Sequence, residues 1–138
     1  ADIMAGIRGT KWAPPFVMLD RIVHMSRDTA VAEVEFNGGA ERFTYRNHTS
    51  PSLLIEAMAQ LSLALIRHSD PAVEIGIIPS LREMTMTPPP TRRFNAVIHV
   101  RWVDGGFPRY EFAGTALVNG RSVCEAMLDI LATREDDR

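Results

Sequence analysis

The hydrophobic and polar positions of the chain follow two periods, a helical one in the middle and a strand-like one around it. Residues 53–66 are almost wholly apolar, interrupted by Glu56, Gln60 and Ser62. A run of this length and composition is typical of a buried helix. Glu56 and Gln60 are four residues apart, so they share one face of that helix.

Capping rules predict where this helix begins and ends. Thr49 or Ser50 can cap the free amides, and Pro51 suits the first turn, where its missing N–H costs nothing. Basic side chains favour the negative end of the helix dipole, so the helix is expected to end near Arg67 or His68.

Alternation of period two predicts about six strands. Residues 30–36 alternate cleanly, which indicates a strand with one wet side. Turns are expected at residues 104–106 and at Asn119-Gly120, where both residues tolerate the positive φ of a type I′ hairpin. The predicted strands lie within residues 16–23, 30–36, 75–87, 94–102, 109–118 and 121–132, and residues 133–138 are expected to form a solvated tail.

One long apolar helix flanked by about six strands indicates an α+β fold. The antiparallel sheet must wrap its apolar face around the helix. Its outer strand edges stay open, and pairing of such edges would produce a dimer. We expect residues 1–138 to form a single domain, because 138 residues that are 46% hydrophobic suit one core.

Composition argues against several classes of protein. A net charge of -2 does not suit non-specific nucleic-acid binding. The single cysteine, Cys124, cannot form an internal disulfide and is expected to pack in the core. The lack of an internal disulfide and of a signal-like start together predict a cytoplasmic protein. The apolar run falls short of the roughly 20 residues of a membrane span. Ligand-spaced cysteine or histidine pairs and a phosphate-binding glycine loop are missing, so no metal or cofactor is expected.

Glu56 is the residue in this pattern that most needs an explanation. An ionised carboxylate removed from water is costly, so it neutralises, pairs, or serves as an acid or base. The structural alternative is a carboxylate bonded to the backbone or paired with an arginine. Gln60, one turn later, could orient this acid, contact a substrate or satisfy a strand carbonyl.

Three stretches of the chain, in order and spanning nearly all of it, are similar to one known family. Residues 15–22 (PFVMLDRI), 54–60 (LIEAMAQ) and 114–126 (GTALVNGRSVCEA) resemble the opening, central helix and closing hairpin of FabZ-type 3-hydroxyacyl-(acyl-carrier-protein) dehydratases. The resemblance implies a hot-dog fold in a homodimer, or in a heterodimer with a related subunit. It also implies an acyl thioester substrate on acyl carrier protein or coenzyme A, in fatty-acid or polyketide-type biosynthesis.

The resemblance also assigns catalytic roles. In that family the helix glutamate is the general acid that protonates the departing 3-hydroxyl, and Glu56 matches its position. Apolar surroundings suit this role because they raise the pKa of a carboxyl group. A backbone amide at the helix start holds the thioester carbonyl, which here implies the amides near Ser52 and Leu53.

The family's base is a histidine of the partner subunit, and its segment is not matched here. That histidine lies in a GHFPGRPVMPG stretch, and the equivalent position is Arg42. A shortened loop would place His48 in the role, so His48 is the provisional base; otherwise the base is missing. The approach to the helix resembles, more faintly, divergent dehydratase-like proteins of aryl-polyene-type pathways. His24, His68 and His99 have no local support as bases.

Arginines and methionines supply further candidates. Arg92 and Arg93 follow a proline run and could contact an acidic carrier protein or its phosphopantetheine, or simply be solvated. Four methionines could line an acyl tunnel or fill gaps in the core. These are Met58, Met84, Met86 and Met127.

Two alternatives to dehydration stay open. One is thioester hydrolysis, in which Glu56 activates water, since the same fold supports both reactions. The other is a non-catalytic acyl-binding or partner subunit that kept the helix and lost the base.

Overall fold

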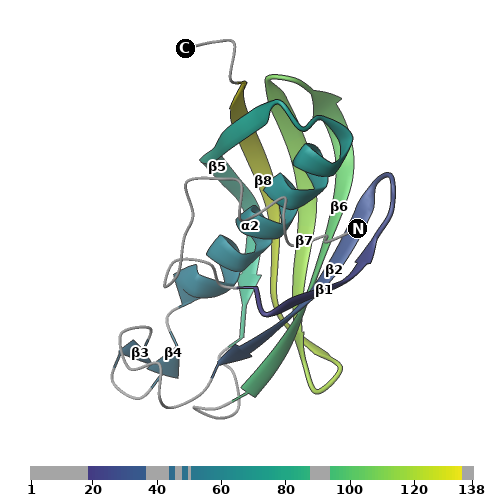
Figure 1. The fold of residues 1–138 in the computed structure, drawn as a ribbon. Coiled ribbons are helices and arrows are strands. Elements are labelled where there is room, and N and C mark those ends of the chain that lie inside the picture. The colour runs from purple at the N-terminus through teal and green to yellow at the C-terminus, as the bar shows by residue number, and fades with distance from the viewer. Residues whose placement is uncertain (1–18, 37–43, 46–47, 50, 88–93, 135–138) are drawn as a thin grey trace.

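A computed structural model describes residues 19–36, 44–45, 48–49, 51–87 and 94–134. Most of them form a six-stranded antiparallel sheet that curls around one long helix (Figure 1). This confirms the predicted α+β architecture. The elements are β1 (Arg21–Met25), β2 (Thr29–Phe36), β3 (Thr44–Tyr45), β4 (His48–Thr49), α2 (Pro51–Ser69), β5 (Val73–Met86), β6 (Phe94–Gly106), β7 (Arg109–Val118) and β8 (Arg121–Arg134).

The strand order places α2 across the concave face of the sheet. The order is β1-β2-β6-β7-β8-β5, and every neighbouring pair is antiparallel. α2 contacts β2, β5, β6, β7 and β8. The two short strands β3 and β4 pair with each other just before α2. They were not predicted, because the polar segment that contains them has no strand alternation.

Alternation in β2 and β6 sorts their side chains as predicted. In β2 the residues Ala30, Ala32, Val34 and Phe36 are buried, while the side chains between them lie on the outer face. The rings of Phe36 and Phe94 stack across the two strands with centroids 4.9 Å apart. Burying this apolar face against α2 removes it from water, which is the main favourable term in folding.

The first strand begins later than predicted. β1 starts at Arg21, and residues 16–18 lie outside the described residues. Just before β1, Asp20 bonds to β2 twice: its backbone N–H donates to the carbonyl of Glu33 at 3.0 Å, and its carboxylate accepts from the backbone N–H of Glu35 at 2.5 Å. Arg21 instead forms an ion pair with Glu33 at 2.9 Å on the adjacent strand.

The turn between β6 and β7 also lies later than predicted. It falls at Phe107-Pro108, whereas residues 104–106 stay in the ladder. The indole N–H of Trp102 lies 3.0 Å from the carbonyl oxygens of both Asp104 and Gly105. Gly105 has a φ of +83°, which glycine adopts without strain. A bulge after Trp102 thus lets the strand continue past its turn-like residues.

The last strand extends beyond its predicted end at residue 132. Thr133 and Arg134 belong to β8 and are not part of a solvated tail, while residues 135–138 lie outside the described part. Arg134 donates to the carboxylate of Asp70 from two nitrogens, at 2.9 and 2.7 Å. Its guanidinium also lies 3.8 Å from the ring centroid of Phe107. These contacts tie the end of the sheet to the turn that follows α2.

The hairpin between β7 and β8 is confirmed. Asn119 and Gly120 have φ values of +53° and +76°, as the type I′ turn requires. Val118 and Arg121 close the ladder on either side of them.

The outer face of β5 is held to the sheet by a polar network. The Ser80 hydroxyl donates to the carboxylate of Asp129 on β8, and this bond holds the pKa of Asp129 below its usual range. The guanidinium group of Arg82 forms ion pairs with the carboxylates of Asp129, at 3.3 Å, and of Glu111 on β7, at 2.9 Å. The network spans three strands at the edge of the sheet.

The helix approaches β7 most closely at Gly114. A Cβ atom there would lie 2.7 Å from the Met58 sulfur and 3.1 Å from a methyl carbon of Leu128. Both neighbours are fully buried, so neither has room to move away. Among the described residues, no helix combines the length and apolarity that crossing a membrane requires.

Gly114→Ala is therefore expected to destabilise the protein by about 1–3 kcal/mol, through overpacking. Denaturant unfolding measures this difference. Gly106→Ala is the matched control, because nothing lies within 4 Å of its added Cβ. Equal unfolding free energies for the two variants would contradict the close packing of Met58 on β7.

Candidate active site

α2 brings one ionisable side chain to the surface of an otherwise buried stretch. From Leu54 to Ile66 every residue is buried except Glu56, which is partly exposed. Glu56, in the second turn of α2, is therefore the one residue of this stretch that reaches the surface, and we call this place the helix opening. The residues before and after it in the sequence pack into the core. A partly exposed carboxyl group in an otherwise buried stretch is a candidate acid or base.

The surroundings of Glu56 favour its protonated form. Burial raises the pKa of Glu56 above its ordinary value, and a hydrogen bond from Gln60 acts in the opposite direction. The Gln60 side-chain nitrogen donates to Glu56 Oε1 at 3.5 Å. Gln60 itself is fully buried. The arrangement can hold a proton at Glu56 and release it to a nearby oxygen.

Three other predicted site residues, His48, Ser52 and Leu53, lie at or before the start of the same helix. Leu53 is partly buried and packs against the core. Ser52 lies in the first turn of α2, and His48 pairs with Tyr45 in the β3–β4 ladder. The side chains of His48 and Ser52 lie outside the described part of the chain. The structure thus brings the backbones of these residues to one end of the molecule (Figure 1).

Arg92 and Arg93 lie outside the described residues, so their predicted contact with a carrier protein stays a prediction. The remaining histidines lie away from the helix opening. His24 and His99 are exposed on β1 and β6, and His68 is exposed in the last turn of α2.

Cys124 packs in the core, as predicted. It is 1% exposed, and burial raises the pKa of its thiol to about 11. The thiol therefore stays protonated at neutral pH and does not act as a nucleophile.

The four methionines separate into different environments. Met58 is fully buried and Met86 packs against the core. Met127 alternates with buried residues of β8 and so lies on the outer face, away from α2. Met84 is 51% exposed on β5. Met127 therefore does not line a channel beside the helix.

Sequence reasoning missed the exposed apolar side chains of β5. Leu81 and Met84 are 40% and 51% exposed on this strand, which lies at the edge of the sheet. β5 runs back along α2, since Arg67 donates to the carbonyl of Val73 and Leu63 lies beside Gly76. The later residues of β5 thus return toward the end of the molecule where α2 begins. The non-alternating run from Ser80 to Met86 was the available signal.

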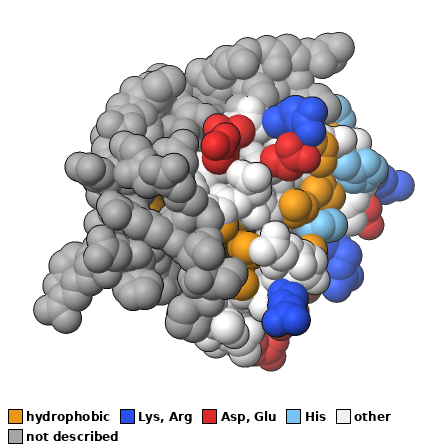
Figure 2. Space-filling model, turned by 90° about the horizontal axis from the view of Figure 1, so that it is seen from below, with side chains coloured by type: hydrophobic (Ala, Val, Ile, Leu, Met, Phe, Trp, Pro, Cys, Tyr) orange, Lys and Arg blue, Asp and Glu red, His pale blue; other side chains and the backbone are white. Residues whose placement is uncertain are grey.

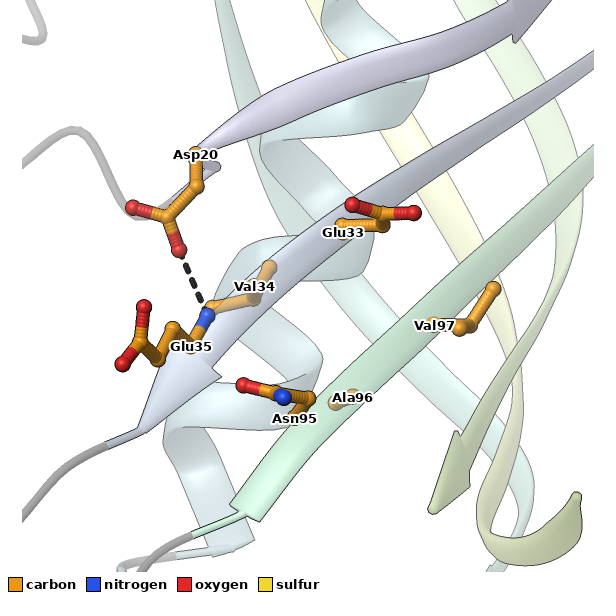
Figure 3. A pocket seen from close by; sticks show the side chains of 7 residues that line it. All are labelled: Asp20, Glu33, Val34, Glu35, Asn95, Ala96 and Val97. Atoms are coloured by element: carbon orange, nitrogen blue, oxygen red, sulfur yellow. Dashed lines mark hydrogen bonds between the residues drawn. The ribbon is translucent and has the colours of Figure 1, made fainter. Parts of the chain in front are cut away.

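A hollow on the outer face of the sheet is separate from Glu56. It lies over β1, β2 and β6 and is lined by the acids Asp20, Glu33 and Glu35 together with Asn95 (Figure 3). The contacts of Asp20 with β2 and of Glu33 with Arg21 are structural. No group of three or more histidine, cysteine or acidic side chains in the described ranges could hold a metal ion. Seen from below, acidic, basic, histidine and apolar side chains intermingle on the described surface (Figure 2).

The raised pKa of Glu56 predicts a pH-dependent stability effect. The folded protein holds this proton more tightly than the unfolded chain, so ionisation destabilises it as pH rises through the raised pKa. Glu56→Gln cannot ionise and should be more stable than the wild type at about pH 8. The difference should shrink toward about pH 3, below the unfolded-state pKa of glutamate, where the carboxyl group is protonated in both states.

Denaturant unfolding at the two pH values measures this effect. Glu125→Gln is the control, because Glu125 is exposed on β8 and should show no such gain. A Glu56→Gln variant with no advantage at the higher pH would contradict a raised pKa of Glu56 in the folded protein.

The chain matches no family model, and no curated protein matches it in sequence. Solved structures are similar over most of its length. A chain of the dehydratase heterocomplex ApeI:P from Xenorhabdus doucetiae aligns with a TM-score of 0.81 and 17% identity, over 95% of this chain and 92% of that one. A hypothetical thioesterase from Streptococcus pneumoniae, solved with coenzyme A, aligns with a TM-score of 0.65 and 15% identity, over 83% and 85%.

A third similar structure is a mutant of the phenylacetic acid degradation protein PaaI from Thermus thermophilus. Its TM-score is 0.65 and its identity 12%, over 83% of this chain and 93% of that one. At these identities the likeness concerns the fold. The chain has a hot-dog fold, as its sequence predicted.

Proposed function

We propose that this chain acts on acyl thioesters, and that its favoured reaction is the elimination of water from a 3-hydroxyacyl-acyl-carrier-protein. One observation carries the proposal: Glu56 is the single opening in the buried stretch from Leu54 to Ile66, and burial raises its pKa. A protonated carboxyl group at an apolar opening suits a general acid. The likeness to a chain of a dehydratase heterocomplex supports the same reaction class.

The proposed reaction transfers two protons. A base, provisionally His48 of the partner subunit, removes the proton from C2, and the electron pair of that bond forms the C2–C3 double bond. The C3–O bond breaks with its electron pair on oxygen, and Glu56 protonates this oxygen so that water leaves. Backbone amides near Ser52 and Leu53 would hold the thioester carbonyl at the positive end of α2. The product is an enoyl thioester.

The edge of the sheet supports the proposal of a dimer. Leu81 and Met84 expose apolar surface on β5, and β8 is the sole strand that pairs with β5 in the described part of the sheet. An open edge with apolar side chains favours pairing with another chain. That chain would be a second copy or a related subunit, and Arg92 and Arg93 remain the proposed contacts for the carrier protein.

Thioester hydrolysis is the second candidate, supported by the likeness to the streptococcal thioesterase. The two reactions need Glu56 in opposite protonation states. An acid must begin protonated, whereas a group that activates water must begin as a carboxylate. The raised pKa of Glu56 favours the acid role, and hence dehydration.

Glu56→Gln is expected to lower the rate of enoyl thioester formation from a 3-hydroxyacyl thioester by at least about a hundredfold, because the amide has no proton to donate. The absorbance of the conjugated product measures the rate. Glu125→Gln, an exposed substitution on β8, should keep wild-type activity. Full activity in Glu56→Gln would overturn the acid role.

The choice between the two reactions is tested with two substrates. We expect the wild type to form enoyl product from a 3-hydroxyacyl thioester and to release no thiol from a saturated one. Thiol release from the saturated substrate, lost in Glu56→Gln, would establish hydrolysis instead. Inertness toward both substrates, in the presence of the partner subunit, would favour a non-catalytic acyl-binding subunit.

A further inference from the structure

Gln60 is an unusual residue for the middle of a buried helix. Its side chain is fully buried, and in the described part of the chain the other fully buried polar residue is Ser62. Ser62 donates its hydroxyl proton to the carbonyl of Met58, one turn earlier in its own helix. Gln60 instead directs its amide nitrogen at the carboxyl group of Glu56. Burying an amide is costly unless its hydrogen bonds are made, so this direction needs a reason.

The reason lies in the charge that Glu56 acquires when it acts as an acid. Once its proton leaves, a carboxylate stands among apolar side chains, where a charge is poorly solvated. An amide N–H stabilises the ionised form more than the protonated one, because a charged acceptor makes the stronger hydrogen bond. Burial and Gln60 thus act in opposite directions on the pKa of Glu56: burial favours the protonated form, and the hydrogen bond lowers the cost of losing the proton.

We propose that Gln60 is a positioning residue that stabilises the Glu56 carboxylate formed during proton transfer, by donating to Oε1 and leaving Oε2 to carry the proton. This inference rests on the proposed acid role of Glu56. The separation of 3.5 Å is long for such a bond. It should shorten when the acceptor becomes charged, because charge-assisted hydrogen bonds are shorter and stronger.

Burial separates this role from a direct contact between Gln60 and substrate. Glu56 is partly exposed, whereas Gln60 is 0% exposed. The amide is therefore not accessible from the surface at which the carboxyl group of Glu56 is partly exposed. A ligand at the helix opening meets Glu56 first, and Gln60 acts through it.

The wild-type protein tests the inference without any substrate. The carboxyl carbon of Glu56 and the side-chain amide of Gln60 can be followed by NMR during a pH titration. We expect the Gln60 amide signals to shift with the same midpoint as Glu56. Gln60 signals that stay constant while Glu56 titrates would overturn the proposal.

Two variants add an independent measurement. Gln60→Met keeps the side-chain volume without the donor, so the titration midpoint of Glu56 should rise and kcat should fall about tenfold with KM little changed. Ser62→Ala removes the other buried polar group of α2 and should leave the midpoint in place. An unchanged midpoint in a folded Gln60→Met protein would overturn the proposal, and the wild-type titration decides alone if that variant does not fold.

The outcomes also separate this inference from the reaction proposed above. Coupled titration of Gln60 and Glu56, together with full activity in Glu56→Gln, would mean that the hydrogen bond exists and the acid role is wrong. If Glu56→Gln loses activity but Gln60 and Glu56 do not titrate together, the acid role of Glu56 stands and the positioning role of Gln60 is overturned.

Discussion

The structure depends on covering one almost wholly apolar helix. From Leu54 to Ile66 every residue of this helix except Glu56 is buried, so most of its circumference must be packed against other elements. A flat sheet would cover one side, whereas the curled antiparallel sheet contacts α2 from five of its strands. The closeness of Met58 to Gly114 follows from this wrapping, because a side chain on β7 would keep the two elements apart.

Curling around a helix leaves the sheet with two edges, and the structure treats them differently. β1 is a strand of 5 residues, and an ion pair between Arg21 and Glu33 lies near its start. β5 has 14 residues and is held to β8 and β7 by the network around Asp129. That network lies on the outer face, and within residues 19–36, 44–45, 48–49, 51–87 and 94–134 no strand pairs with the far edge of β5. The longer edge is therefore the one that suits a second subunit.

The same wrapping sets the chemistry of Glu56. The carboxyl group of Glu56, partly exposed in an otherwise buried stretch, loses hydration, so its pKa is raised above that of an exposed glutamate. This arrangement costs stability at neutral pH, and a site that stores such a cost is typical of function. Gln60 reduces the cost of the charged form through a bond that the helix period itself provides.

Much of the secondary structure of this protein could be predicted from its sequence, because it depends on local chemistry. The apolar run and its capping residues predicted α2, alternation predicted the faces of β2 and β6, and the positive φ tolerated by Asn119 and Gly120 predicted their hairpin. Such features depend on near neighbours along the chain. Tertiary contacts lie at the strand ends that the sequence misplaced: Asp20 bonds to β2 just before β1, and Arg134 pairs with Asp70 at the end of β8. Tertiary contacts also decided that Glu56 is the one residue between Leu54 and Ile66 that reaches the surface, because burial depends on elements far away in the sequence.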